Sequence, residues 1–385
     1  MLSLLTSISL ASENIETSIQ SSYHYDSNLF RLADEDEAKL KLGDSDMSDR
    51  FLQLAAAIKA NLPISRQLLS FNAEIQDVRF DRFDYLNYTG GNAQANWNWQ
   101  YSKYLNGEIL LDYERIQSNF EDFQFVEGDI QTKQGGKFSV QHNANPDLHG
   151  KVTFSWRDID HSASRQKVSN RQVRTVQTEF RFFTRARTYF GIRFGFTSVS
   201  FPDRVVTETS TTDDGFSDTS LNMTLRINTS HKTTLEGWGG FTLRTYDNLT
   251  KNNTYGFTGN FKHTWRVTDK FELVSSIWRD FDPVSDGFNN QLIKMGIKVE
   301  PQWMITTKIM FMITAQHEVR NYDNTDENTT GSREDDTTRL LASVNYLFNR
   351  NLQWGVALQT EKRSSSNKQW RYKNKYAMTS LKFMF

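Results

Sequence analysis

Alternation between apolar and polar residues runs through almost the whole chain and constrains its fold more than any other feature. Phe190, Ile192, Phe194 and Phe196 alternate with Gly, Arg, Gly and Thr, and the same period of two recurs in later segments such as 255–266. Successive side chains of a β-strand point to opposite faces of its sheet. Each segment therefore predicts a strand with one apolar and one polar face.

Three features separate these strands from those of a soluble sandwich. The segments extend over ~10–14 residues, whereas soluble strands average about 5–6. Aromatic residues lie near their ends, as at Trp97 and Trp99, and short connections such as 62–66 alternate with long, acidic ones such as 32–48. This pattern predicts an all-β fold, a transmembrane antiparallel up-and-down β-barrel with a polar interior. The mean hydropathy of −0.63 fits a wall that is apolar on its outer face alone.

Counting the segments predicts about eighteen strands. Sixteen is the alternative, if the two weakest segments, 129–142 and 271–282, are loops. Residues 1–11 form a short apolar run ending in Ser-Leu-Ala, which is typical of a secretory signal peptide or its remnant. A buried first strand is the other interpretation of this run. The remaining residues, 12–385, are predicted to form a single outer-membrane β-barrel.

Composition and spacing favour a protein without catalysis. The net charge of −1 argues against nucleic acid as a partner, and the absence of Cys excludes thiolate chemistry. The seven His show no metal-ligand spacing, and no Gly-x-Ser-x-Gly motif is present. We therefore expect no enzyme activity, no metal and no cofactor. A hydrolase site in the lumen or the loops remains the alternative, because spacing alone does not exclude it.

The polar faces of the predicted strands supply a set of lumen-lining candidates in which basic residues outnumber acidic ones. Such a lumen would favour anionic or hydroxyl-rich solutes, whereas charges that pair with each other would instead stiffen the wall. Trp238 and Trp278 could stack on sugar rings if they point inward. The charged candidates are Lys59, Glu74, Arg181, Arg193, Arg226, Glu236, Arg244, Lys262, Arg266, Lys294, Lys298, Glu300, Arg339, Glu361 and Lys382.

The last strand ends in a second recognisable feature. Its apolar face includes Leu381, Phe383 and the C-terminal Phe385. Terminal strands of this kind are read by the barrel-assembly machinery of bacterial outer membranes. The three residues are therefore predicted to act as an assembly signal.

One short run carries a resemblance to a known family. It comprises Tyr25, Asp26, Ser27, Asn28, Leu29, Phe30 and Arg31, and the turn Leu62-Pro-Ile-Ser-Arg-Gln67 adds to it. Both resemble the EpsL-like barrels of exopolysaccharide operons, also called "putative β-barrel porin 2". The resemblance implies a porin in the bacterial outer membrane, in contact with lipid and lipopolysaccharide. It also implies a periplasmic Wza-like polysaccharide-export protein as a partner, and a structural or partner-contact role for the run.

Two functions follow as expectations. The first is a conduit through which an exopolysaccharide or biofilm polysaccharide is secreted. The alternative is a porin for diffusion or uptake of small oligosaccharides or anionic solutes. Porins for small solutes usually fold a long loop into the lumen. The loops here are only moderately long, with Leu32–Ser48 the best candidate, which favours a wide bore or a movable gate.

Overall fold

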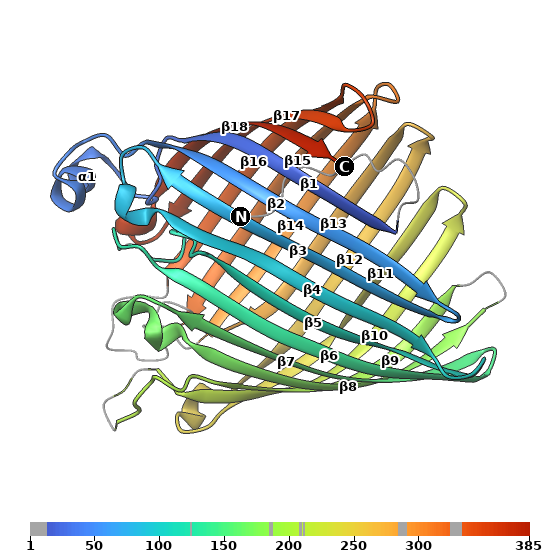
Figure 1. Ribbon diagram of the computed structural model, residues 1–385. Helices are drawn as coiled ribbons and strands as arrows, with labels where there is room; N and C mark the ends of the chain where they lie inside the picture. The colour runs from blue at the N-terminus through green and yellow to red at the C-terminus, as the bar shows by residue number, and fades with distance from the viewer. Residues whose placement is uncertain are drawn as a thin grey trace.

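A closed sheet of eighteen antiparallel strands forms the wall of the protein in this computed structural model (Figure 1). The structure describes residues 14–123, 125–184, 188–207, 210, 212–283, 291–323 and 333–385. The strands of the first half are β1 (Ile15–Asp26), β2 (Asp49–Ile64), β3 (Gln67–Phe80), β4 (Tyr88–Gln100), β5 (Leu105–Gln117), β6 (Ile130–Asn145), β7 (Leu148–His161), β8 (Arg171–Phe183) and β9 (Tyr189–Ser200). Those of the second half are β10 (Gly215–Ser230), β11 (Thr233–Tyr246), β12 (Thr254–Thr268), β13 (Phe271–Asp282), β14 (Gln291–Met304), β15 (Ile309–Asp323), β16 (Arg333–Leu347), β17 (Leu352–Ser365) and β18 (Tyr372–Met384).

Each strand pairs with its neighbours along the chain, and β18 returns to pair with β1. At this seam Ser18 lies opposite Met384 and Asp26 opposite Tyr376. A closed sheet leaves no open edge, so the backbone can satisfy its hydrogen bonds inside a bilayer. The prediction of an eighteen-stranded barrel is confirmed. The two weak segments, 129–142 and 271–282, are the strands β6 and β13.

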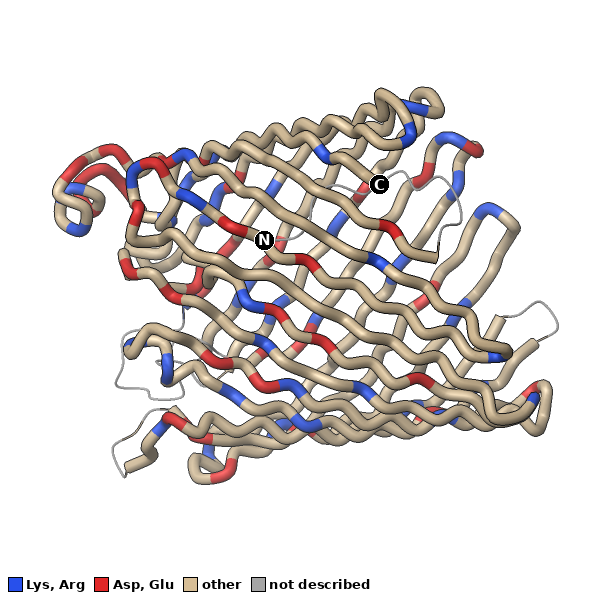
Figure 2. Tube along the Cα trace, in the orientation of Figure 1, with Lys and Arg blue, Asp and Glu red and all other residues tan. Residues whose placement is uncertain are grey.

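The two ends of the barrel differ in their connections. Turns of two residues join β2 to β3, β6 to β7, β10 to β11 and β12 to β13, and we call this end the turn side. The opposite end, the loop side, carries the longer connections, the α-helix α1 (Glu35–Leu42) and short 3-10 turns at Asp84–Leu86, Ser164–Ser169, Thr250–Asn252 and Lys368–Trp370. Helix α1 lies beyond the strand ends, in the strongly acidic loop of Figure 2. Within the described residues, no helix is long and apolar enough to cross a membrane.

The outer face of the wall carries large apolar side chains that are well exposed. On β9, Ile192, Phe194 and Phe196 are each 42–53% exposed, and Met223 on the neighbouring β10 is 69% exposed. A monomeric soluble protein rarely exposes a contiguous patch of this size. On the lipid-facing wall of a transmembrane barrel such a surface is expected.

Placing one charge on each face of β10 tests the register. Met223 points outward near the middle of the strand, whereas Ser220 lies on the inner face opposite Thr242. We expect Met223→Arg to lower the free energy of unfolding by about 2–4 kcal/mol, since a cation at the bilayer midplane is poorly solvated. Ser220→Arg should cost far less. Urea unfolding in liposomes measures both, and equal losses would mean that the register is wrong.

Candidate functional site

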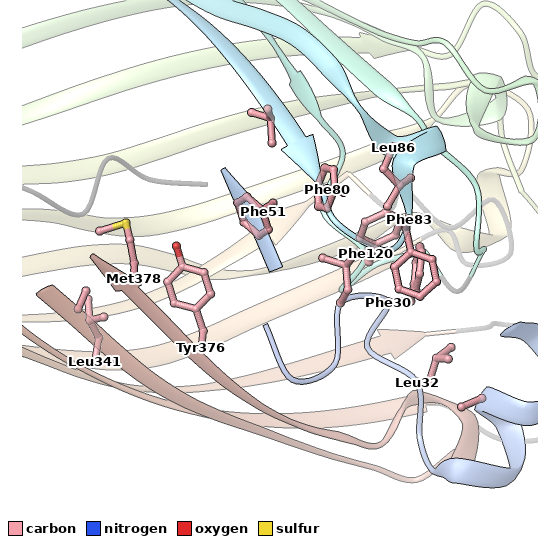
Figure 3. Close-up of a cluster of buried hydrophobic side chains, with 14 residues drawn as sticks. Phe30, Leu32, Phe51, Phe80, Phe83, Leu86, Phe120, Leu341, Tyr376 and Met378 are labelled. Carbon is pink, nitrogen blue, oxygen red and sulfur yellow. The ribbon is translucent and has the colours of Figure 1, made fainter. Parts of the chain in front are cut away.

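Three loop-side segments fold into the barrel mouth and bury a hydrophobic core there. Phe30 from the β1–β2 loop, Phe83 from the β3–β4 loop and Phe120 from the β5–β6 loop pack edge to face, with ring centroids 4.7–4.9 Å apart. Figure 3 shows these three rings together at one end of the cluster, next to Phe80 of β3, with wall residues of β16 and β18 at its other end. We call this group the mouth core. Its 14 buried residues are Leu29, Phe30, Leu32, Ala38, Phe51, Val78, Phe80, Phe83, Leu86, Phe120, Leu341, Ala357, Tyr376 and Met378.

The run Tyr25–Arg31 directs the first of these segments inward. The guanidinium of Arg31 lies 3.0 Å from the buried carboxylate of Asp26, so the chain reverses direction tightly between them. Asn28 bonds reciprocally to the backbone of Leu32, at 2.7 and 2.9 Å. Arg31 takes a left-handed backbone conformation with φ of 59°. This turn leaves Phe30 only 1% exposed in the mouth core, so the family-like run has a structural role in the mouth.

Hydrogen bonds also hold this turn to the last strand. The backbone N–H of Asn28 donates to the side-chain oxygen of Asn374, at 3.1 Å. The hydroxyl of Ser27 accepts from the backbone N–H of Lys375, at 2.7 Å. The turn is therefore fixed across the seam between β1 and β18.

Residues 118–123, which we call the inward segment, reach across the lumen to the wall of β15–β17. The Nη2 of Arg339 donates to Oε1 of Glu121, at 2.7 Å, and the Nη1 of Arg363 donates to the Glu121 carbonyl, at 2.6 Å. The Nη1 of Arg320 donates to Oδ1 of Asp122, also at 2.7 Å. Because the inward segment starts at β5, these contacts join distant parts of the wall and narrow the mouth.

The loop Leu32–Ser48, expected to be the best constricting candidate, contributes to the mouth, whereas the inward segment is the part that crosses the lumen. Helix α1 occupies about half of that stretch and lies outside the strand ends, while Leu32 and Ala38 belong to the mouth core and Leu42 and Met47 pack against it. The inward segment, which does cross the lumen, follows β5. This strand ends at Gln117, and the chain then turns into the lumen.

Ser118, Asp129 and His161 clamp the base of the inward segment. The Nδ1 of His161 lies 2.6 Å from Asp129, and the hydroxyl of Ser118 donates to the same carboxylate. The side-chain amide of Gln131 donates to Nε2 of His161, at 3.2 Å, so the ring proton lies on Nδ1 and points at Asp129. A hydrolase needs its serine on the free ring nitrogen. Ser118 is instead 3.4 Å from Nδ1, an arrangement suited to holding the loop.

Arginines of the wall keep the Asp122 carboxyl ionised. Burial by itself would raise the pKa of Asp122, but Arg320, with Lys294, Arg363 and Arg333 around it, outweighs this and lowers the pKa below its ordinary value. A carboxyl with a lowered pKa in the docked state stabilises docking above its ordinary pKa, and this contribution is lost only as pH falls through the lowered value.

We therefore expect the channel conductance to stay nearly constant from pH 7 down to about 4, the ordinary pKa of an Asp side chain. Opening of the mouth should require more acidic solution. In Asp122→Asn the conductance should be higher at pH 7 and should not rise further on acidification. Conductance measured across this range tests the point. A rise in the unaltered protein centred near pH 5 would contradict it.

The strand registers place every predicted lumen residue on the inner face. Most are paired with a neighbouring charge. Glu236 lies between Lys262, at 3.6 Å, and Arg226, at 4.0 Å. Further pairs join Arg181 to Glu179, Arg266 to Glu272, Lys294 to Asp282, Lys298 to Glu300 and Arg339 to Glu361.

Arg244 does not face the water of the lumen. Its side chain is 1% exposed, donates to Asp218 at 2.8 Å and packs over Phe216. It is therefore a structural residue of the wall. Among the described residues, Lys59, Arg193 and Lys382 form no ion pair within 4.0 Å, and Arg193 lies over the ring of Trp238, 4.7 Å from its centroid. Trp238 and Trp278 both lie on the inner face, opposite Asn260.

The predicted excess of basic residues on the inner face is much smaller than the sequence-based set suggests, although further bases such as Lys133, Lys137 and Arg157 also lie inside. The sequence-based set leaves out many acids whose register puts them inside. These include Glu108, Asp112, Glu114, Glu179, Asp218, Glu272, Asp282, Glu318 and Asp335. Because they interleave with the cations, charges on the wall pair instead of forming one broad basic field.

The arginine cluster at the mouth is the feature that sequence reasoning largely missed. Arg339 and Glu361 are among the predicted residues, whereas Arg320, Arg363 and Glu121 are not. The run Phe120-Glu-Asp-Phe-Gln-Phe125 carries a signal that could have found the inward segment. Three Phe in a loop wholly exposed to water would be unfavourable, so the run predicts that the loop packs against the protein, as Phe120 does in the mouth core.

The predicted assembly residues lie together at the turn side. Leu381 and Phe383 point outward from β18, and the rings of Phe383 and Phe385 are in edge contact, with centroids 4.7 Å apart. Their recognition by the assembly machinery stays a prediction. Among the described residues, no group of His, Asp and Glu is arranged to hold a metal ion.

Comparison with known proteins gives the barrel a context. The model of a family described as "Putative beta-barrel porin 2" matches residues 196–385, just under half of the chain. No curated protein matches the sequence. OccK9 (OpdG) of Pseudomonas aeruginosa is similar in structure with a TM-score of 0.52 and 10% identity, over 96% of this chain and 98% of that one.

Two further solved structures are similar at the same level. OccK2 (OpdF) of Pseudomonas aeruginosa has a TM-score of 0.51 and 8% identity, over 97% of this chain and 98% of its own. A BenF-like porin of Pseudomonas fluorescens has a TM-score of 0.50 and 8% identity, over 97% and 99%. At such identities the likeness is one of fold. The chain is a bacterial outer-membrane β-barrel with the fold of a porin, and its C-terminal half resembles the "Putative beta-barrel porin 2" family.

Proposed function

We propose that the protein is a passive channel through which small water-soluble molecules cross the outer membrane. The observation that carries this proposal is the docking of Glu121 and Asp122 on the opposite wall of the lumen. This contact, together with the mouth core, narrows the loop side of the barrel. A narrowed mouth suits diffusion of small solutes and opposes the passage of a thick hydrated polymer.

The comparisons favour the same choice between the two expected functions. One similar structure is described as a BenF-like porin, and no comparison points to polysaccharide secretion. Export therefore rests on the resemblance of Tyr25–Arg31 and of the turn Leu62–Gln67, and in the structure the first of these runs contributes Leu29 and Phe30 to the mouth core. A polysaccharide, a Wza-like partner, lipopolysaccharide and the assembly machinery remain predicted partners.

The inner wall supports solutes that are polar and of either charge. Its acids and bases alternate, and Trp238 and Trp278 offer aromatic faces on which sugar rings can stack. Small oligosaccharides and small anions both fit such a wall.

Conductance and liposome swelling test the function together. The purified protein in a planar bilayer should give a steady conductance, and liposomes that contain it should swell in small sugars at rates that fall steeply with sugar size. Empty liposomes are the control. Liposomes that pass dextran as readily as glucose would support a polymer conduit. An absence of both conductance and swelling would contradict any channel function.

A further inference from the structure

The wall of β15–β17 holds one more arginine than its own acids can partner. Glu318, Asp335 and Glu361 each accept from one arginine, at 2.7–2.8 Å, and these arginines are Arg320, Arg333 and Arg339. Arg363 is the fourth. Its nearest wall carboxylate, that of Asp335, is 3.9 Å away, beyond hydrogen-bonding distance. This part of the wall can therefore bind an additional anionic group, which would pair with Arg363.

Arg363 also has a buried donor that points at this position without a partner. Its side chain is 0% exposed, and its Nη2 forms no hydrogen bond although it lies 3.9 Å from Oε2 of Glu121. Buried polar groups are normally hydrogen-bonded, and an unpaired one costs free energy. A carboxylate placed slightly deeper than that of Glu121 would satisfy this donor.

The present occupants are carboxylates of the inward segment. Arg320 contacts both, with Nη1 at 2.7 Å from Asp122 and Nη2 at 4.0 Å from Glu121. The site thus holds two carboxylate groups around a single guanidinium. A small solute with two carboxylates separated by a few bonds would reproduce this arrangement.

Exposure shows where such a solute would enter. The side chains of Asp122 and Arg339 are 37% and 28% exposed, whereas those of Arg320 and Glu121 are 11% and 10% exposed. A solute carboxylate can reach the rim at Asp122 and Arg339 from water, and Arg363 forms the floor.

We propose that Arg320, Arg339 and Arg363 form a binding site for small dicarboxylates, and that Glu121 and Asp122 are resident competitors for it. A dicarboxylate binds by replacing these two side chains on the arginines, which loosens the inward segment as the solute enters. The proposal deepens the proposed function and rests on it, because it names a solute class for the same mouth.

Binding of succinate tests the proposal in two ways. One is block of the channel current when succinate is added on the loop side of a bilayer, and the other is titration calorimetry of the protein in detergent. The unaltered protein should bind succinate in both. In Glu121→Gln/Asp122→Asn the affinity should rise about tenfold, since the competing charge-assisted hydrogen bonds are gone. In Arg339→Gln, which leaves the residues of the inward segment unchanged, the affinity for succinate should fall by a similar factor.

Glu108→Gln/Asp112→Asn is the matched control. It removes the same charge from the inner face of β5, where the two acids pair with Lys137 and Arg157. Its affinity for succinate should stay close to that of the unaltered protein. An equal rise in this control, equally tight binding of inorganic phosphate, or no binding of succinate to a conducting channel would each overturn the proposal. Binding measured by calorimetry in a protein that does not conduct would instead refute the channel function alone.

Discussion

Replacing Phe120, Glu121, Asp122 and Phe123 with Gly and Ser raises the single-channel conductance several-fold, if the inward segment sets the width of the mouth. The substitution removes Phe120 from the mouth core and both carboxylates from the arginine wall. Without the contacts of Phe120 and of the two carboxylates, little remains to hold the loop across the lumen. Conductance of the purified variant in a planar bilayer measures the change.

A second set of four residues provides the control for this experiment. Glu35, Asp36, Lys39 and Leu40 belong to α1, beyond the strand ends, and are exposed. The same Gly and Ser replacement there should leave the conductance unchanged. If both variants conduct like the unaltered protein, another part of the barrel limits the flow.

Glu361→Ala is expected to give the largest loss of stability in the barrel. Its side chain is 1% exposed and accepts from Arg339, at 2.8 Å, and from the hydroxyl of Tyr372. Removal of Glu361 breaks its buried ion pair with Arg339 and leaves Arg339 with Glu121 as its remaining carboxylate partner. It also takes the acceptor from the buried Tyr372 hydroxyl. Breaking a buried pair in this way costs about 3–5 kcal/mol. Urea unfolding in liposomes measures this loss.

Two further substitutions show whether the loss comes from the buried charge. Glu361→Gln keeps an acceptor for Tyr372 and should lose less stability than Ala. Glu334→Ala alters an outward-facing acid of β16 and should change the free energy of unfolding by no more than about 0.5 kcal/mol. Equal effects of Glu361→Ala and Glu334→Ala would argue against the buried network.

The sequence predicts the wall well because the alternation within each strand is enough to assign its residues to the lipid-facing or the lumen-facing side. In β9 the alternation of Phe194 and Phe196 with Gly195 and Thr197 is enough to decide which side meets lipid. The same local rule places Arg181 and Glu236 inside. Short turns then fix the order of strands, since an antiparallel neighbour is the simplest continuation.

The mouth is harder to predict because its contacts join residues that are far apart in the chain. Glu121 meets Arg339 and Arg363 across more than two hundred positions, and no local pattern links them. The ion pair of Arg244 likewise depends on Asp218 of the neighbouring strand, so alternation alone predicts a lumen charge where the structure has a buried ion pair. Local alternation reports the face of a residue and says nothing of its partners.

The position of the mouth core has a consequence for the order in which the protein matures. Phe51 and Phe80 come from β2 and β3, whereas Tyr376 and Met378 come from β18, so the core spans the junction between the first and last strands. The mouth core can form completely only after β1 and β18 have paired. The narrow mouth therefore forms late in folding. Before the aromatic rings pack, the nascent barrel has a wider mouth and a higher permeability.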